Sequence, residues 1–217
     1  MRRLKWSVLL AFALLIGGFF HYVLPQHDVV RIVGTSVQRM DLGTNAWFFA
    51  APDAGNAQVP GGTREVKFIE TFLADGRPMV FRNEDTGWGW PPYFKMNSFD
   101  VQTRATDLTS TEAAPRWVMV THYGWRNQFM TIFPNALRLK LVASPDVRVF
   151  PWFNTLFFIS LGVALLALRR AWLRFRADTV EPMIDEAEAA WDRADAAQDR
   201  ARGALARWWR RLLGRSG

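Results

Sequence analysis

The sequence predicts an α+β membrane protein in which two transmembrane helices flank a small exported β-barrel, with a further helix at the C-terminal end. Two stretches, 6–24 and 150–168, contain no formally charged residue. Basic residues border each stretch on the side away from the middle of the chain. Between the two stretches, short apolar runs alternate with polar residues, as in half-buried β-strands. Together these patterns predict both the topology and the fold class.

The charge and composition narrow the classes of function. A formal net charge of +7 suits either nucleic acid or anionic lipid. Here basic residues precede the first apolar stretch, follow the second and recur near the end of the chain. This placement indicates membrane topology and membrane-surface contact. We therefore predict no nucleic-acid partner. The absence of cysteine excludes disulfides, thiolate metal ligands and cysteine nucleophiles.

The first apolar stretch, 6–24, is about as long as a membrane span requires. A cleaved signal peptide is the alternative, but the stretch is longer than the usual apolar core of about 7–15 residues and no small-x-small site follows it. It ends instead in aromatic residues and Pro25, which is typical of an interfacial belt. The pattern favours an uncleaved anchor, with residues 1–5 in the cytoplasm.

The second stretch, 150–168, opens with Pro151 and an interfacial tryptophan, Trp152, and stops at Arg169 and Arg170. Since the basic flanks of both spans face away from the central segment, the positive-inside rule places residues 25–149 outside the cytoplasm. Both ends of the chain, including 169–217, are expected inside.

The exported segment, 25–149, shows five strand-like runs and one short helical pattern. The expected strands are 29–37, 66–72, 78–82, 117–123 and 136–142, and the expected helix is 97–108. A turn at Asp75 and Gly76 joins the second and third strands into a hairpin. The order β-β-β-α-β-β is that of a five-stranded OB-like barrel. An irregular β-sandwich is the alternative.

Several segments of the chain carry a family resemblance. They are 21–32, 81–94, 97–100, 123–126 and 133–135. In these segments and in their order along residues 6–160, the chain resembles a bacterial family catalogued as domain of unknown function 1523. The resemblance implies a Gram-negative inner-membrane protein, and with the positive-inside rule the central domain is then expected in the periplasm. It implies no reaction, catalytic residue or cofactor.

The candidate binding residues gather after the third expected strand. They are Glu84, Asp85, Trp88, Trp90 and Tyr93. Three aromatic rings among glycines and prolines form a stiff loop that suits stacking on a sugar, a peptide or a partner protein, with the two acids as polar handles. The alternative, which we favour, is that the tryptophans close the end of the barrel or lie on lipid headgroups.

Trp125 and Arg126 form a second candidate site, in which the guanidinium holds an anion. We favour the alternative that Trp125 belongs to the core and Arg126 pairs with Glu84 or Asp85.

His27, Asp28 and His122 have the chemistry of metal ligands, but their spacing is not that of a compact metal motif. We predict no metal and no cofactor. The serines lie in no nucleophile elbow and no glycine-rich phosphate loop is present, so we predict a protein without catalytic activity.

The C-terminal segment, 169–217, is rich in Ala, Arg, Asp and Glu, and predicts a helix with a heptad stripe interrupted at Gln198. Its first half is acidic and its second half is basic. The membrane-contacting residues expected at its end are Trp208, Trp209, Arg210 and Arg211. The first half suits self-association or docking to a partner. A solvated helix with an apolar stripe is the alternative.

Taken together, the sequence predicts a non-enzymatic inner-membrane protein whose periplasmic domain binds or scaffolds another envelope or membrane protein. A binding module for a small ligand or oligosaccharide ranks second, and an envelope hydrolase third. The bilayer is an expected partner, as is a second copy through the tail.

The topology is directly testable. Because basic flanks mark both inner ends, a reporter fused at Ala57 should report an exported position and a reporter after Gly217 a cytoplasmic one. Paired alkaline phosphatase and green fluorescent protein fusions measure this. A cytoplasmic signal at Ala57 contradicts the topology.

Overall fold

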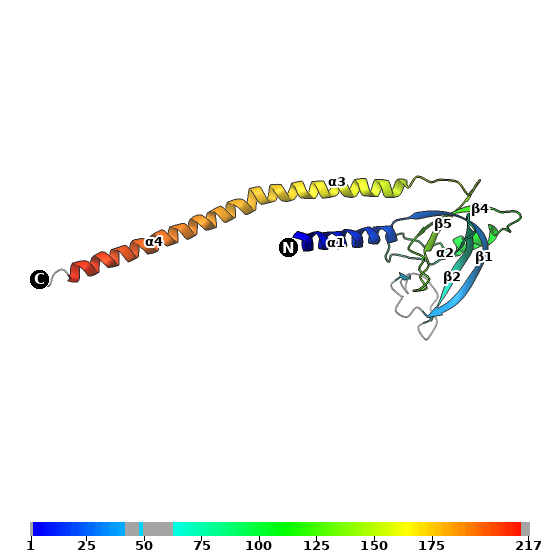
Figure 1. The fold of residues 1–217 in the computed structure, drawn as a ribbon, viewed down its shortest axis with the longest axis horizontal. Helices are drawn as coiled ribbons and strands as arrows, with labels where there is room; N and C mark the ends of the chain where they lie inside the picture. Colours follow the sequence, from blue (N-terminus) through cyan, green and yellow to red (C-terminus); the bar gives the residue numbers. More distant parts are fainter. Residues whose placement is uncertain (1, 42–47, 50–62, 214–217) are drawn as a thin grey trace. The chain divides into compact units, whose positions relative to one another are not determined.

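The computed structural model describes residues 2–41, 48–49 and 63–213 (Figure 1). The chain divides into two compact units, Met1–Asn154 and Thr155–Gly217. The first unit holds helix α1 (Arg2–Val23), five strands and helix α2 (Ser98–Asp107). Helix α3 (Trp152–Phe175) begins in the first unit and continues into the second.

The five strands form one sheet that closes on itself in the order β1-β2-β3-β5-β4, with β4 pairing back onto β1. Their bounds are Gln26–Asp41 for β1, Thr63–Leu73 for β2, Pro78–Arg82 for β3, Trp117–Tyr123 for β4 and Asn135–Val142 for β5. All strand pairs are antiparallel except β3 with β5. Strand β1 serves two partners, because its first residues pair with β4 while residues from Val30 to Asp41 pair with β2.

A register shift between Ile32 and Gly34 lets β1 bend from one partner to the other. Gly34 suits this point, because an added Cβ would lie 3.1 Å from the Glu70 Oε2 atom. The Glu70 carboxylate accepts a hydrogen bond from Ser36 Oγ at 2.8 Å, so it has little freedom to withdraw.

The core of the barrel is apolar and is closed by one face of α2. The buried residues that pack together are Val30, Ile32, Ile69, Phe81, Val101, Ala105, Leu108, Val118, Val120 and Ala136. Those of α2 recur at helical spacing, so one side of this short helix is inside and the other is solvated. A second cluster lies on the opposite face of β2, where Val66 and Phe68 are covered by Phe49, with Phe48 and Phe133 beside them.

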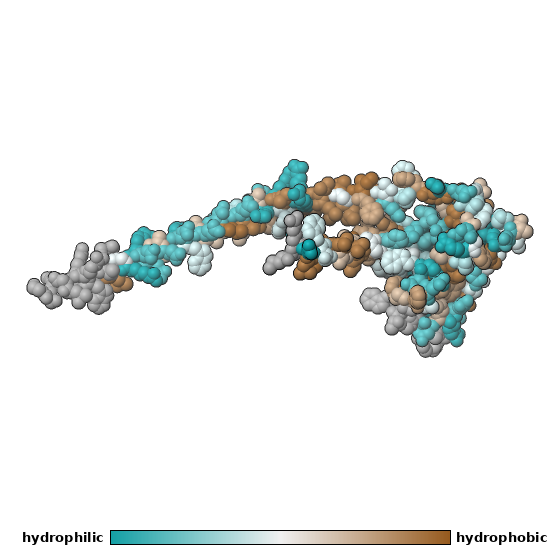
Figure 2. Space-filling view, viewed as in Figure 1, coloured by the Kyte–Doolittle hydropathy of each residue, from teal (hydrophilic) through white to brown (hydrophobic). Residues whose placement is uncertain are grey.

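Helices α1 and α3 are long and apolar enough to cross a membrane, and their apolar side chains are not buried within the protein. Figure 2 shows apolar residues along both helices and mainly polar residues along the helix that follows α3. Leu14 is 68% exposed and Leu165 is 56% exposed, which is costly in water and favourable in lipid. The finding agrees with the two predicted apolar helices, while the choice of the residues inside the bilayer stays a prediction.

The second unit is helical throughout its described part. A five-residue π-helical segment, Arg176–Val180, follows α3 and leads into α4 (Glu181–Leu213). The predicted C-terminal helix is thus present. Large apolar residues of the predicted stripe are exposed, namely Ile184, Trp191 and Leu205. The side chains of Trp208, Trp209, Arg210 and Arg211 lie outside the described part of the structure, so their predicted membrane contact stays a prediction.

The predicted order of strands and helix within residues 25–149 is confirmed. The fourth strand matches its predicted bounds, and the observed helix, Ser98–Asp107, lies within the predicted 97–108. The largest difference is β1, which extends beyond 29–37 at both ends because β4 and β2 provide partners there.

Candidate functional site

The C-terminal end of α1 joins the barrel without a linker, since the helix ends at Val23 and β1 begins at Gln26. The last four carbonyls of a helix have no partner within its regular hydrogen-bonding pattern. In α1 all four of them accept hydrogen bonds. Phe20 O accepts the last regular bond of the helix, from Leu24 N at 2.8 Å. The donors to the other three come from outside the helix: Gln26 Nε2 to His21 O at 2.7 Å, Gly124 N to Tyr22 O at 2.8 Å, and the Tyr93 hydroxyl to Val23 O.

Gly124 follows β4 and has a φ of +91°, a conformation that strongly favours glycine. An added Cβ would also lie 3.6 Å from the Tyr22 ring and 3.5 Å from Pro134 Cα. The glycine thus brings a backbone N–H close to the end of α1. The barrel thereby caps the helix C-terminus.

Aromatic rings surround the same helix end. Tyr22 packs edge-on against Trp125, with ring centroids 5.4 Å apart, and Trp125 Nε1 is 2.8 Å from His21 Nδ1. Trp90 stacks on Phe19 at 5.8 Å with the two planes 16° apart. Rings from two loops therefore lie on the last two turns of α1.

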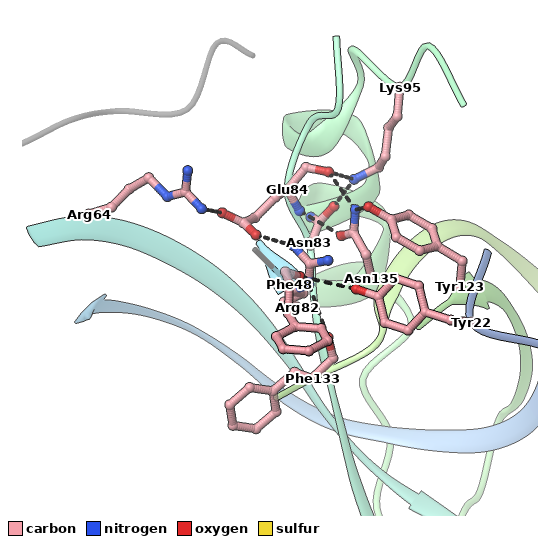
Figure 3. A network of polar contacts seen from close by, with 10 residues as sticks. All are labelled: Tyr22, Phe48, Arg64, Arg82, Asn83, Glu84, Lys95, Tyr123, Phe133 and Asn135. Carbon is pink, nitrogen blue, oxygen red and sulfur yellow. Dashed lines mark hydrogen bonds and ion pairs between the residues drawn. The ribbon is translucent and has the colours of Figure 1, made fainter. Parts of the chain in front are cut away.

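A buried ion cluster lies near Tyr22 (Figure 3). The Glu84 carboxylate pairs with Arg64 at 2.6 Å and with Arg82, and all three side chains are at most 5% exposed. Arg82 Nε also donates to Phe133 O at 3.0 Å. The ring of Phe49 lies 5.1 Å from the Arg82 guanidinium carbon, which helps to cover the charge.

Asn135, at the start of β5, extends the cluster by a reciprocal pair of bonds. Its Oδ1 accepts from Glu84 N at 2.9 Å and its Nδ2 donates to Glu84 O at 3.0 Å. Lys95 Nζ donates to the same carbonyl at 3.0 Å and to Asn83 Oδ1 at 2.5 Å. Burial lowers the pKa of Lys95 to about 7, despite the opposing attraction of Asp85.

Asp85 caps α2 from outside the helix. Its carboxylate accepts from Ser98 N at 2.8 Å and from Ser98 Oγ at 2.6 Å. Lys67 Nζ donates to the same hydroxyl at 3.1 Å. An acid at a helix N-terminus satisfies orphan N–H groups and complements the helix dipole. Asn97 occupies the N-cap position and Ser98 is the first helical residue, so the capping carboxylate comes from the preceding loop.

The predicted binding residues of the aromatic loop do not share one surface, because its tryptophans are exposed and its acids are buried. Trp88 is 84% exposed and Trp90 is 60% exposed, while Tyr93 is half-buried against Tyr123, with stacked rings 4.9 Å apart. The expectation that Glu84 and Asp85 serve as exposed polar handles is wrong. Both are buried: Glu84 pairs with two buried arginines, and Asp85 accepts hydrogen bonds at the N-terminus of α2.

The predicted pairing of Arg126 with Glu84 or Asp85 is also wrong. Arg126 donates to Ile132 O at 3.0 Å and to Asn127 O at 3.2 Å, and its guanidinium carbon lies 4.3 Å from the Phe133 ring centroid. Trp125 packs on α1. It is 40% exposed, so it is not a core residue. The Glu84 carboxylate is instead held by Arg64 and Arg82, and the Asp85 carboxylate by Ser98.

His122 Nε2 and Asp28 Oδ2 do meet, at 3.0 Å. His27 pairs with Thr121 in the register, one residue away from Asp28, and so points to the opposite face of β1. Within the described residues no group of three His, Asp or Glu side chains is arranged to hold a metal ion.

Sequence reasoning missed the residues at the centre of the ion cluster, namely Arg64, Arg82, Lys95 and Asn135. One signal was available. Arg82 directly follows the apolar run 79–81 within its strand and stands two residues before Glu84, so the polar residues that follow continue the strand and need not belong to a solvated loop.

Comparison with known proteins gives two matches. The model of the family described as "Protein of unknown function (DUF1523)" matches residues 1–176. The chain belongs to this family. A Haemophilus influenzae protein described as an uncharacterized protein is similar to the chain, with 31% identity over 179 residues, which cover 79% of this chain and 97% of the relative. No solved structure matches the chain.

The DUF1523 match includes α1, the barrel and all of α3, and it ends in the π-helical segment before α4. Every residue of the ion cluster and of the helix cap therefore lies inside the family region. The family resemblance expected from the motifs is confirmed, and α4 lies outside that region.

The ion cluster predicts a large effect of a small change. Glu84→Gln leaves two buried guanidiniums without their counter-charge, and breaking such a pair costs about 3–5 kcal/mol. Pulse proteolysis of the full chain in detergent micelles across urea measures the free energy of unfolding. Asp75→Asn is the control, since its pair with Arg77 is exposed and should contribute little. Equal losses in both variants contradict the role of the cluster.

The Lys95 environment predicts a rise of stability with pH. The unfolded chain keeps this lysine charged up to its ordinary pKa of 10.5, whereas the folded chain loses the proton above about 7. Between these values the unfolded state binds more protons, so the free energy of unfolding increases with pH. Measurement from about pH 7 to pH 9 avoids tyrosine titration.

Lys95→Met should remove this slope as well as lower the stability, because Asn83 Oδ1 and Glu84 O lose their donor. Lys140→Met, at an exposed position of β5, should keep the slope. An unchanged slope in Lys95→Met assigns the pH dependence to another group.

Proposed function

We propose that this DUF1523 protein is a non-enzymatic scaffold of the bacterial inner membrane. Its OB-like domain stands in the periplasm, fixed to the end of its first span, and holds another envelope component close to the membrane. Both ends of the chain lie in the cytoplasm. The proposal rests on how the barrel is attached and on which of its surfaces are already covered.

The OB-like assignment is supported by the strand order β1-β2-β3-β5-β4 and by the helix between β3 and β4. OB barrels bind oligonucleotides and oligosaccharides on the face of strands 2 and 3 and on the neighbouring loops. In this chain that face of β2 carries Arg64, Val66 and Phe68, which are at most 4% exposed.

The cover on this face comes from the chain itself, and this observation carries the proposal. Phe49 lies in one cluster with Val66 and Phe68, and Phe133 packs edge-on against Phe68 at 5.0 Å. A ligand would have to displace these rings and expose the ion pairs behind them. The usual ligand face is thus filled, which favours a scaffold over a binding module for a sugar or a small molecule.

The attachment of the barrel supports an uncleaved anchor. Removal of the first span would leave Tyr93 and Gly124 without the carbonyls that they cap, and it would uncover the Trp90 and Trp125 rings. The basic residues in the first turns of α1 and in the last turns of α3 support the inward orientation of both ends.

The absence of catalytic activity is supported by the roles of the two acids nearest the aromatic loop. General acid–base work needs a carboxyl group within hydrogen-bond reach of a substrate. Glu84 is enclosed by two arginines and Asp85 holds the N-terminus of α2. Both groups serve the fold.

Native mass spectrometry of the full chain, released gently from its own membranes, tests the proposal. We expect a complex whose added mass is that of a second protein species. A matched sample with Glu84→Gln, which loosens the barrel on its anchor, should lose most of this species while keeping the chain in the membrane. Asp75→Asn should retain it.

Other outcomes decide against the scaffold. An added mass of a few hundred daltons that recurs at fixed stoichiometry identifies a ligand or oligosaccharide module. A chain without any added species contradicts both. A complex that survives Glu84→Gln but requires α4 places the partner site on the cytoplasmic tail.

A further inference from the structure

The loop Trp88–Phe94 lies beside α1 at a depth that the helix itself defines. Trp90 stacks on Phe19, which is four residues before the end of α1 at Val23. At 1.5 Å per residue, Phe19 lies about 6 Å inside that end. The apolar stretch Arg3–Val23 is only about long enough to cross the hydrocarbon layer, so both rings lie at its outer boundary.

Trp125 gives an independent measure of the same depth. An added Cβ on Gly18 would lie 3.7 Å from the Cη2 atom of the Trp125 ring. The ring therefore reaches one residue deeper on α1 than Phe19. Two loops of the barrel thus place indoles against the outer part of a helix that is otherwise uncovered.

The surface of the loop is amphipathic and free of acidic residues. Trp88 is 84% exposed, Trp90 60% and Phe94 55%, and the Trp88 and Phe94 rings pack at 5.3 Å. From Thr86 to Phe94 the chain carries no charged residue. Tryptophan is enriched at membrane interfaces, where its ring is buried and its N–H group meets polar headgroups.

We propose that the loop Trp88–Phe94 inserts into the headgroup layer of the outer leaflet and seats the barrel on the lipid surface. The occupant of this apolar surface is phospholipid, because the adjacent helix already fixes its depth in the bilayer. Trp88 is two residues from Trp90 and so lies within about 8 Å of it along the chain. The inference rests on the proposed function only in requiring that α1 spans the membrane.

The chain contains no cysteine, which allows a clean test on the full protein. Trp88→Cys is labelled with an environment-sensitive fluorophore and reconstituted into nanodiscs of phosphatidylethanolamine and phosphatidylglycerol. Ala114→Cys is the matched control. It is exposed and precedes β4, whereas the opposite end of β4 leads to Gly124 and α1.

We expect the label at position 88 to have blue-shifted emission and to lose intensity when brominated phospholipid replaces the ordinary lipid. The label at position 114 should emit as in water and should not respond. Water-like emission and no quenching at position 88 overturn the proposal. Blue-shifted emission without quenching also overturns it, because the label is then buried in protein.

Leu14→Cys separates this failure from a failure of the span itself. Leu14 lies in the middle of α1 and is exposed. Quenching at position 14 without quenching at position 88 rejects the loop insertion and leaves the anchor in place. No quenching at either position rejects the spanning helix, and with it the proposed function.

Discussion

The C-terminal end of a membrane-spanning helix needs hydrogen-bond donors for its unpaired backbone carbonyls, and this need constrains the loops beside it. Its last four carbonyls have no regular helical partner, and in or near hydrocarbon an unsatisfied carbonyl costs several kcal/mol. In α1 the carbonyls of residues 21–23 accept hydrogen bonds from Gln26, Gly124 and Tyr93, which all belong to the barrel domain. The positions of the β3–α2 and β4–β5 loops follow from this requirement.

The buried ion cluster explains how such a small barrel holds those donors in place. Glu84 links Arg64 of β2 to Arg82 of β3, and its backbone is bonded to Asn135 of β5. A buried ion pair adds little net stability, and we infer that its role here is to fix which strands lie together. The β3–β5 contact consists of a single parallel pair, Arg82 with Asn135, so the cluster holds the seam where the barrel closes.

Much of the fold was predictable because it depends on local patterns. Strand β4 alternates buried and half-buried residues along its length, and α2 carries Val101, Ala105 and Leu108 at helical spacing. The candidate site was predicted less well, because it depends on contacts between distant residues. Glu84 meets Arg64 twenty positions earlier in the chain, and no local pattern distinguishes that pair from solvated charges. The aromatic loop was found from its composition, but its place beside α1 required the fold.

Our central proposal is that the barrel is fixed on the C-terminal part of α1 in the membrane. The most direct measurement is thiol cross-linking in native membranes with Phe19→Cys and Trp90→Cys in one chain, where the rings stack at 5.8 Å. A short bifunctional thiol reagent should join the two positions efficiently within one chain, while Phe19→Cys with Ala114→Cys should remain unlinked. If the 19–90 pair links no better than the 19–114 pair, the barrel is not docked on its anchor and the account is contradicted.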